Sequence, residues 1–280
     1  MKLIQKIISA VITAAMLAAA GCGGTAEQTS ETASETAAQT AAEPTSSAAE
    51  TKEETTVTRP ERPTFTKDDK VIALTFDDGP NLTTTTAVIN KLEEYDIVAS
   101  FFLVGDNITG NANEGSAKVF KRAYDMGCEI NSHSRTHSNM TEMSPEDIKA
   151  EMDYTSDKIF EITGERPHFF RPPYIAVNDV MFENIDLPFI AGYGANDWED
   201  SVSADERAEK VLAQAKDGAI ILLHDMQGNS KTVEALDTII PALKDEGYNF
   251  VTVSELFAAK GVEPQDNIVY SYAEQTAMYG

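Results

Sequence analysis

The stretch VIALTFDDGP, residues 71–80, decides how this chain folds. Its first six residues, five of them apolar, make a buried strand of ordinary length, and Gly79-Pro80 ends it in a turn. Asp77 and Asp78 therefore stand at a strand end, where a turn can bring both carboxylates to one rim. Adjacent like charges need a cation, and a metal ion is the usual one. A solvated Asp-Gly turn is the plainer alternative.

Similar apolar runs recur along the chain and alternate with helical patterns. The strand-like runs are Val71–Phe76, Val98–Val104, Cys128–Asn131, His168–Arg171, Phe189–Tyr193, Ala219–Leu223 and Phe250–Val253. The helical patterns are Thr84–Tyr95, Ser116–Met126, Pro145–Ile162, Ala204–Ala215 and Thr232–Asp245. This alternation predicts an α/β fold with parallel strands, and about seven apolar strands favour a barrel covered by helices. In such folds the chemistry gathers at the carboxyl ends of the strands.

Composition narrows the class of protein. The chain has 280 residues, of which 42% are hydrophobic, which is enough for a full core. Its formal net charge of −24 argues against nucleic-acid binding, because phosphates would be repelled. No interior stretch is long and apolar enough to span a membrane. We read the acidic balance as surface solvation.

The first residues read as a secretion signal. Lys2 and Lys6 precede an apolar run, Ile7–Ala20, of signal length. The sequence LAAAGC, residues 17–22, resembles a bacterial lipobox, which predicts lipidation at Cys22. Acyl chains there would anchor the protein to the extracellular face of the cell membrane. The alternative is an ordinary signal peptide cleaved near the alanines, which would leave the protein secreted.

The chain divides into four predicted segments. Residues 1–21 are the signal peptide, and residues 22–64 form a tether rich in Thr, Ala, Ser and Glu, which we expect to be disordered. Residues 65–260 form the globular domain, and residues 261–280 are a C-terminal tail. Cys128 falls in a predicted strand, so we expect a buried free thiol and no disulfide.

Three of the four histidines follow predicted strands. His133 and His137 lie four residues apart in HSRTH, and with a carboxylate they make the three-ligand set that zinc prefers. His224 ends an apolar strand, where it is placed for proton transfer or simply caps the strand through Asp225. Two exposed loop histidines are the alternative for HSRTH. His168 stands at a strand start and is expected to be structural.

A further strand ends in RPPY, residues 171–174. The two prolines fix the backbone and therefore the direction of Arg171. Arg171 is placed to pair with one of the two carboxylates, which would hold it ionised and lower its pKa.

Together these motifs resemble the polysaccharide deacetylases with a NodB-type domain, the fourth carbohydrate esterase family. The matching segments are TFDDG at 75–79, HSRTH at 133–137, RPPY at 171–174 and LLH at 222–224. The resemblance covers about residues 68–260 and implies a distorted barrel of seven β/α units. It implies a divalent metal, zinc, held by Asp78, His133 and His137.

The same resemblance implies roles for the remaining residues. Asp77 would be the general base, oriented by Arg171, and His224 the general acid that protonates the leaving group. The metal would polarise the acetyl carbonyl and activate a water. The backbone N–H of Tyr174 would stabilise the oxyanion.

The fourth motif departs from the family pattern. The usual Asp-x-x-Asp-Trp reads GANDW at 194–198, so its first Asp is Gly194. Asp197 or Asp200 could replace the missing acid in the network of Arg171 and His224. We expect Asp197 and Trp198, the only tryptophan, to contact substrate in the groove, with core packing as the alternative for Trp198. Ile175 stands where glycine is frequent, which predicts a differently shaped rim.

The predicted function is metal-dependent removal of N-acetyl groups from an extracellular polysaccharide such as peptidoglycan or another glycan containing N-acetylglucosamine. An acetylxylan esterase acting on O-acetyl groups is the first alternative. A non-catalytic, glycan-binding surface lipoprotein is the second. We expect a monomer whose partners are the polysaccharide and, through Cys22, the membrane.

Overall fold

The computed structural model describes residues 59–108 and 115–278. The predicted signal peptide, Cys22 and most of the tether lie outside the described residues. No helix within the described ranges is both long and apolar enough to cross a membrane.

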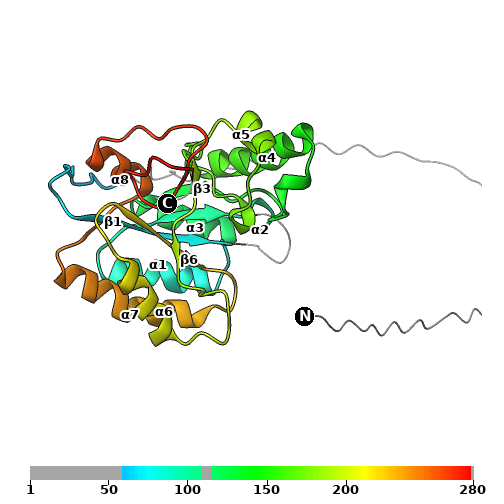
Figure 1. The fold of residues 1–280 in the computed structure, drawn as a ribbon. Helices are drawn as coiled ribbons and strands as arrows, with labels where there is room; N and C mark the ends of the chain where they lie inside the picture. Colours follow the sequence, from blue (N-terminus) through cyan, green and yellow to red (C-terminus); the bar gives the residue numbers. More distant parts are fainter. Residues whose placement is uncertain (1–58, 109–114, 279–280) are drawn as a thin grey trace, which may run out of the picture. The chain divides into compact units, whose positions relative to one another are not determined.

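One parallel sheet organises the domain. Its strand order is β3-β2-β1-β6-β5, and β7 pairs with the start of β1. The strands are β1 (Val71–Asp77), β2 (Ser100–Leu103), β3 (Glu129–Ser132), β5 (Tyr193–Gly194), β6 (Ala219–His224) and β7 (Asn249–Phe250). In Figure 1, β1 and β6 run side by side through the middle of the domain. Asp77 is paired with His224 on one side and with Phe102 on the other. Asp77 and His224 therefore end their strands at one edge, where β2 continues for one more residue.

Single bridges extend this sheet toward a ring. Phe170 bridges Ser132 and Phe189, and β4 (Phe189–Ile190) pairs with β8 (Val269–Tyr270). An antiparallel bridge between Ala219 and Tyr272 leads back to β6. The predicted parallel α/β fold is confirmed. Within the described residues, the two sheets are joined toward a barrel only by single β-bridges, not by continuous strand pairing. Residues beyond 260, which we separated as a tail, thus pack into the same unit.

The predicted strand Phe189–Tyr193 is divided in two. Gly192 has φ +108°, and a Cβ there would lie 3.1 Å from the Leu222 Cβ. The left-handed backbone at this glycine separates β4 from β5.

Five predicted helices are present within a residue or two at most boundaries. They are α1 (Thr84–Glu94), α3 (Ser116–Asp125), α4 (Pro145–Thr163), α6 (Ala204–Gln214) and α7 (Ser230–Asp245). α4 starts as its sequence predicts, because the Ser144 hydroxyl accepts the Asp147 N–H, and it ends at Gly164 with φ +78°. The elements that the sequence did not predict are the strand β8 and the helices α2 (Gly105–Ile108), α5 (Asp179–Asn184), α8 (Val253–Lys260), η2 (Met140–Glu142) and η3 (Pro173–Ile175).

The predicted strand Phe250–Val253 is corrected at its end. Thr252 and Glu255 form a capping box that starts α8 at Val253, so the strand stops at Phe250. The helix cap at Thr252 therefore determines the local structure, although the β-branched residues around it favour a strand.

Both faces of strand β1 are apolar because both are buried. Ile72, Leu74 and Phe76 pack into a cluster with α1 and α7, whereas Val71 and Ala73 pack with residues of β6, α8 and β8. Figure 1 shows α1, α6 and α7 on one side of the β1–β6 pair and α4, α5 and α8 on the other. Burial of each large side chain contributes about 1.5–3 kcal/mol, so the core holds the strand end rigidly.

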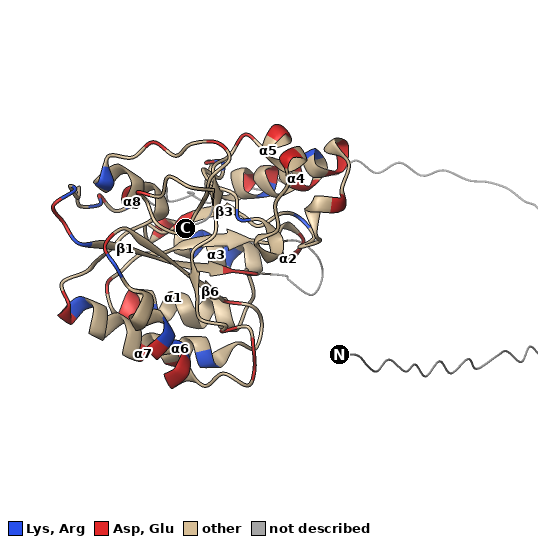
Figure 2. Ribbon diagram, in the orientation of Figure 1, with Lys and Arg blue, Asp and Glu red and all other residues tan. Residues whose placement is uncertain are grey.

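Acidic residues lie on the surface and Cys128 is buried, as the sequence predicted. Figure 2 shows acidic residues on the outer turns of α4, α5 and α6. Cys128 is a buried free thiol, and burial raises its pKa to about 11.

Candidate active site

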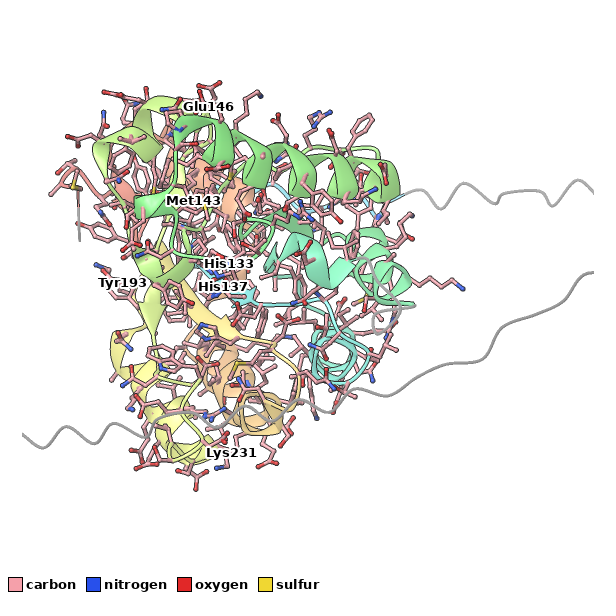
Figure 3. The ribbon with its side chains drawn as sticks, turned by 90° about the vertical axis from the view of Figure 1, so that its right-hand side faces the viewer. His133, His137, Met143, Glu146, Tyr193 and Lys231 are labelled. Carbon is pink, nitrogen blue, oxygen red and sulfur yellow. The ribbon has the colours of Figure 1, made fainter. Side chains whose placement is uncertain are left out.

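The carboxyl ends of β1, β3 and β6 meet in one groove of about 650 Å³. Asp77, Asp78, His133, His137, Tyr174, Trp198 and His224 all line it. Figure 3 shows His133 and His137 side by side at the centre of this face. The structure therefore brings together most of the residues that the motifs singled out. His168 lies elsewhere, with its Nδ1 3.4 Å from the Glu129 carboxylate.

Asp77 and Asp78 separate because the backbone changes conformation between them. Asp77 is the last residue of β1, and Asp78 has a left-handed φ of +74°. Gly79 follows, and a Cβ there would lie 2.4 Å from the Asp225 carboxylate, so only glycine fits without a shift. Asp78 thus faces the two histidines while Asp77 stays buried in the strand end.

Asp78, His133 and His137 form a candidate metal centre. The Asp78 Oδ1 lies 3.4 Å from the His137 Nε2 and 3.6 Å from the His133 Nε2. Ligands about 2.0–2.2 Å from a zinc ion are separated by about 3–4 Å, so these spacings fit one ion. The Asp78 Oδ1 is also buried, with no hydrogen-bond partner among the described residues. Two imidazole nitrogens and an unpartnered carboxylate oxygen suit a divalent metal.

His133 is held in the form that binds a metal. Its Nδ1–H donates to the Arg171 carbonyl at 2.6 Å, which leaves the Nε2 lone pair toward Asp78. Burial lowers the pKa of His133 to about 3, against the charge of Asp78, so the ring is neutral at neutral pH.

The loop between the two histidines is fixed by Glu151 on α4. The Arg135 N–H and the Thr136 N–H both donate to the Glu151 Oε2 at 2.9 Å, and Ser134 Oγ accepts the His137 N–H. Sequence reasoning missed Glu151. The sequence could have indicated it, because Glu151 lies on the same helical face as Ile148 and Met152, and a glutamate buried on an apolar face needs a hydrogen-bond partner.

Asp77 and Arg171 form a buried ion pair. The Arg171 Nη1 lies 2.5 Å from the Asp77 Oδ1, and the guanidinium stacks on the Phe102 ring at 4.1 Å. As expected, Arg171 lowers the pKa of Asp77 through its charge and its hydrogen bond. Burial raises the pKa of Asp77 by more than Arg171 lowers it. A carboxylate with a raised pKa is a better proton acceptor near neutral pH.

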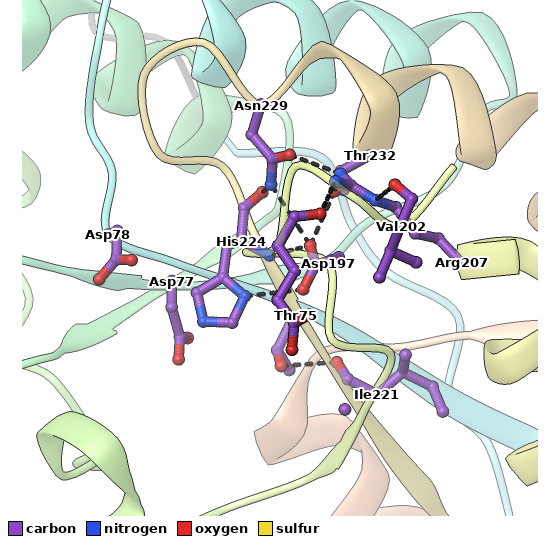
Figure 4. Close-up of polar contacts among 12 residues, drawn as sticks. Thr75, Asp77, Asp78, Asp197, Val202, Arg207, Ile221, His224, Asn229 and Thr232 are labelled. Carbon is purple, nitrogen blue, oxygen red and sulfur yellow. Dashed lines mark hydrogen bonds and ion pairs between the residues drawn. The ribbon is translucent and has the colours of Figure 1, made fainter. Parts of the chain in front are cut away.

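His224 and Asp197 form a second pair. The His224 Nδ1–H and backbone N–H donate to the two carboxylate oxygens of Asp197, each at 2.8 Å (Figure 4). Burial lowers the pKa of His224, but the Asp197 bond and charge outweigh it and raise the pKa to about 9.

The expected groove contact of Asp197 is corrected by this geometry. Asp197 is fully buried, so it holds His224 from behind and is not exposed in the groove. His224 therefore has its acid despite Gly194, and the exposed Asp200 is not needed. No acid replaces the missing Asp beside Arg171, since the Nε and Nη2 of Arg171 have no hydrogen-bond partner among the described residues.

Two aromatic rings form the walls of the groove. Tyr174 is 70% exposed and meets His137 edge to face at 4.8 Å, and Trp198 is 47% exposed and meets His224 at 5.4 Å. Tyr174 and Ile175 have left-handed φ values of +60° and +53°. The β-branched Ile175 therefore occupies a backbone conformation that glycine would adopt without strain, at a cost of about 1–2 kcal/mol.

Comparisons with known proteins agree with this geometry. The family model described as polysaccharide deacetylase matches residues 65–186. The crystal structure of a family 4 acetyl xylan esterase from Clostridium thermocellum, with a cobalt ion, is 41% identical with a TM-score of 0.70 and is covered over its whole length by 74% of this chain. The chain belongs to the polysaccharide deacetylase family.

Two curated relatives extend the comparison for this deacetylase-family chain. The bifunctional xylanase/deacetylase of Pseudobutyrivibrio xylanivorans is 53% identical over 74% of this chain and 33% of its own length. The peptidoglycan-N-acetylglucosamine deacetylase PgdA of Listeria monocytogenes is 38% identical over 69% of this chain and 40% of its own length. The chain thus spans about a third to two fifths of these relatives.

Proposed function

We propose that this chain is a metal-dependent deacetylase that hydrolyses acetyl groups on an extracellular polysaccharide. The single observation that carries the proposal is the convergence of a metal-ligand set with two charged pairs in one groove. Asp77 and His224 lie side by side at the ends of two paired strands, and both line the groove beside the candidate metal ligands, which suits acid–base catalysis.

Asp78, His133 and His137 would hold the ion, and their N/O donor set favours zinc. When bound, the ion supplies a Lewis acid for the acetyl carbonyl and a more acidic water. The cobalt ion in the acetyl xylan esterase structure supports a divalent metal without deciding which one.

Asp77 accepts a proton at its carboxylate as water attacks the acetyl carbon. Arg171 keeps that carboxylate oriented, and burial keeps its pKa raised. His224, protonated through its bond to Asp197, donates a proton from Nε2 to the leaving oxygen or nitrogen. The Tyr174 N–H is the proposed donor to the developing oxyanion, beside the metal ligand His137.

Acetylated xylan is the first substrate to test. The two relatives named for xylan are 53% and 41% identical to this chain, whereas the peptidoglycan deacetylase is 38% identical. Peptidoglycan N-acetylglucosamine is the second candidate, because a lipid anchor at Cys22 would hold the enzyme near the cell wall. Trp198 and Tyr174 offer exposed rings for stacking on sugar faces with either substrate.

The test is acetate release by the zinc-loaded protein from acetylated xylan, peptidoglycan and chitooligosaccharide, with the D77N variant as a matched control. We expect release from at least one substrate, abolished by a chelator and restored by zinc. Metal-loaded protein that binds a glycan but releases no acetate from any of the three would support the glycan-binding alternative instead.

The anchor is a separate proposal that rests on the sequence of residues 17–22. We propose cleavage before Cys22, lipidation of its thiol, and a tether that ends before Arg59. Arg59 and Arg62 already belong to the domain, because Arg59 donates to the Cys128 carbonyl and Arg62 pairs with Glu255. Labelling cells with a fatty-acid probe tests it: wild-type protein should incorporate label and sediment with membranes, and the C22S variant should do neither. Equal labelling of both would refute it. Sedimentation of the purified domain checks the expected monomer.

A further inference from the structure

Arg207 is a buried charge without a charged partner. It lies on α6, is 1% exposed, and within the described part of the chain forms no ion pair with a carboxylate. Its hydrogen bonds go to neutral groups: the Val202 and Glu199 carbonyls, the Asn229 Oδ1 and the Thr232 Oγ1. Burying a guanidinium is costly unless a compensating charge lies near. The Asp197 carboxylate is that charge, one side chain away (Figure 4).

The donors and acceptors in this network can be assigned in one way. Arginine only donates, so the Thr232 Oγ1 accepts from Arg207 at 2.9 Å. The Thr232 hydroxyl proton is then free for its other neighbour, the Asp197 Oδ2, at 2.7 Å. Arg207 therefore directs the hydroxyl toward the carboxylate.

The same logic fixes Asn229. Its Oδ1 accepts from Arg207 at 2.5 Å, which sets the amide so that Nδ2 donates to the His224 carbonyl at 2.9 Å. The Nδ2 also lies 3.5 Å from the Asp197 Oδ2. One guanidinium thus orients two donors around the residue that backs His224.

We propose that Arg207, acting through Thr232 and Asn229, is a positioning residue that orients the Asp197 carboxylate and thereby fixes the Nδ1–H tautomer of His224. Arg207 lies outside the motifs at 75–79, 133–137, 171–174, 194–198 and 222–224. With Nδ1 committed to Asp197, Nε2 is the nitrogen that exchanges a proton. The inference rests on the proposed function, because it concerns the proton that His224 delivers.

Other charged groups also face His224. Asp77 lies opposite it in the register of β1, Asp78 follows, Asp197 contacts its Nδ1, and Asp225 is the next residue along the chain. The ring of Trp198 covers one edge. A purely structural role for Arg207 is the competing account, since it also ties the Glu199–Val202 turn to α6.

The T232V variant separates the two accounts, because it removes the hydroxyl and keeps the shape. We follow the titration of His224 by NMR in the metal-free protein, where no substrate is needed, and the high-pH limb of kcat/KM in the zinc-loaded enzyme. Loss of the hydroxyl that orients Asp197 should shift the apparent pKa of His224 in both measurements by about half a unit or more. T232S, which restores the hydroxyl, should return the wild-type values.

R207M should shift both readouts further than T232V does, with zinc affinity unchanged. R166M removes an exposed arginine and is the matched control. If T232V and R207M lower thermal stability while the His224 titration keeps its wild-type midpoint, Arg207 is merely structural and the proposal fails. If R207M does not fold, T232V alone decides. A shifted titration in a protein that deacetylates nothing would leave the positioning intact and refute only the proposed function.

Discussion

The two halves of the site are built in different ways. What we call the metal half is the set of proposed ligands, Asp78, His133 and His137. It stands on one turn and one loop, where three residues have a left-handed backbone: Asp78, Ser134 and His137. What we call the proton-transfer half is the two pairs with proposed acid–base roles, Asp77 with Arg171 and His224 with Asp197, which join segments distant in the chain.

This difference predicts different sensitivities. The metal half depends on local backbone geometry, and two of its three proposed ligands, Asp78 and His137, are partly exposed to solvent, so its variants should change metal affinity first. The proton-transfer half depends on burial and on partners distant in sequence, so its variants should change turnover and pH dependence while the metal stays bound. Each substitution perturbs one half, and the measurement then shows whether the other half still functions.

The largest effect is expected for D78A, which removes one of the three proposed metal ligands. Zinc affinity and acetate release should fall together to background, because two imidazoles alone bind zinc weakly. Isothermal titration with zinc and an acetate assay measure both. D179A, on the exposed end of α5, is the matched control. Zinc affinity near the wild-type value in D78A would remove Asp78 from the ligand set.

D77N should abolish most turnover and leave zinc bound. The amide keeps the shape of the side chain but cannot take a proton, so kcat should fall by about 10²–10⁴. The zinc content after gel filtration and single-turnover acetate release check it. Equal loss of zinc and activity would show that Asp77 is a ligand and that the two halves are not separate.

D197N should change the pH dependence of His224. In the folded protein the pKa of His224 is raised to about 9, from an ordinary 6.5, by Asp197. In D197N burial remains and the bond to a carboxylate is lost, so the pKa should fall below 6.5. NMR of the imidazole in metal-free protein measures this directly. A midpoint still near 9 would mean that Asp77 or Asp78 is the main cause.

The same pKa shift makes a stability prediction with a definite sign. A raised folded-state pKa stabilises the fold fully below pH 6.5, and this contribution is lost as pH rises through 9. Its upper limit is about 3 kcal/mol, from 1.36 kcal/mol for each unit of pKa. Urea unfolding of the metal-free wild type should weaken across this window, and D197N should lack that part of the slope.

E151Q tests whether the loop of the metal half is held from α4. The amide keeps one acceptor but loses the charge that receives two N–H groups, so zinc affinity should fall by about tenfold. At saturating zinc, kcat should change little. E146Q lies on the first turn of the same helix, is exposed, and serves as control (Figure 3). Unchanged affinity in E151Q would limit Glu151 to loop folding.

The metal half was the easier half to predict from the sequence. Its ligands sit in short motifs directly after apolar runs, and strand ends meet at one edge in any parallel α/β fold. The strand at 71–77 and the helix capped by Ser144 could also be predicted from the sequence, because hydrophobic periodicity and helix caps are local signals.

The proton-transfer half needed the three-dimensional structure. The sign of the pKa shift at Asp77 depends on complete burial, which no motif states. Arg207 and Thr232 read as ordinary polar positions of amphipathic helices until α6 and α7 are packed together over Asp197. The division at Gly192 and the strand β8 also follow from tertiary contacts between distant residues.

The smallest effect is expected for G194D, which restores the first acid of the fourth motif. The backbone at Gly194 is not left-handed, and a Cβ there would meet only the Trp198 ring, at 3.8 Å, so the side chain fits. Because Asp197 already backs His224, the high-pH limb of kcat/KM should stay in place and the rate should change by about twofold or less. A shift of the low-pH limb alone would mean that the new carboxylate reaches the unpaired nitrogens of Arg171 and acts on Asp77. A shift of the high-pH limb would contradict the completeness of the His224 pair, since a second acid should matter only where the first leaves the imidazole unsupported.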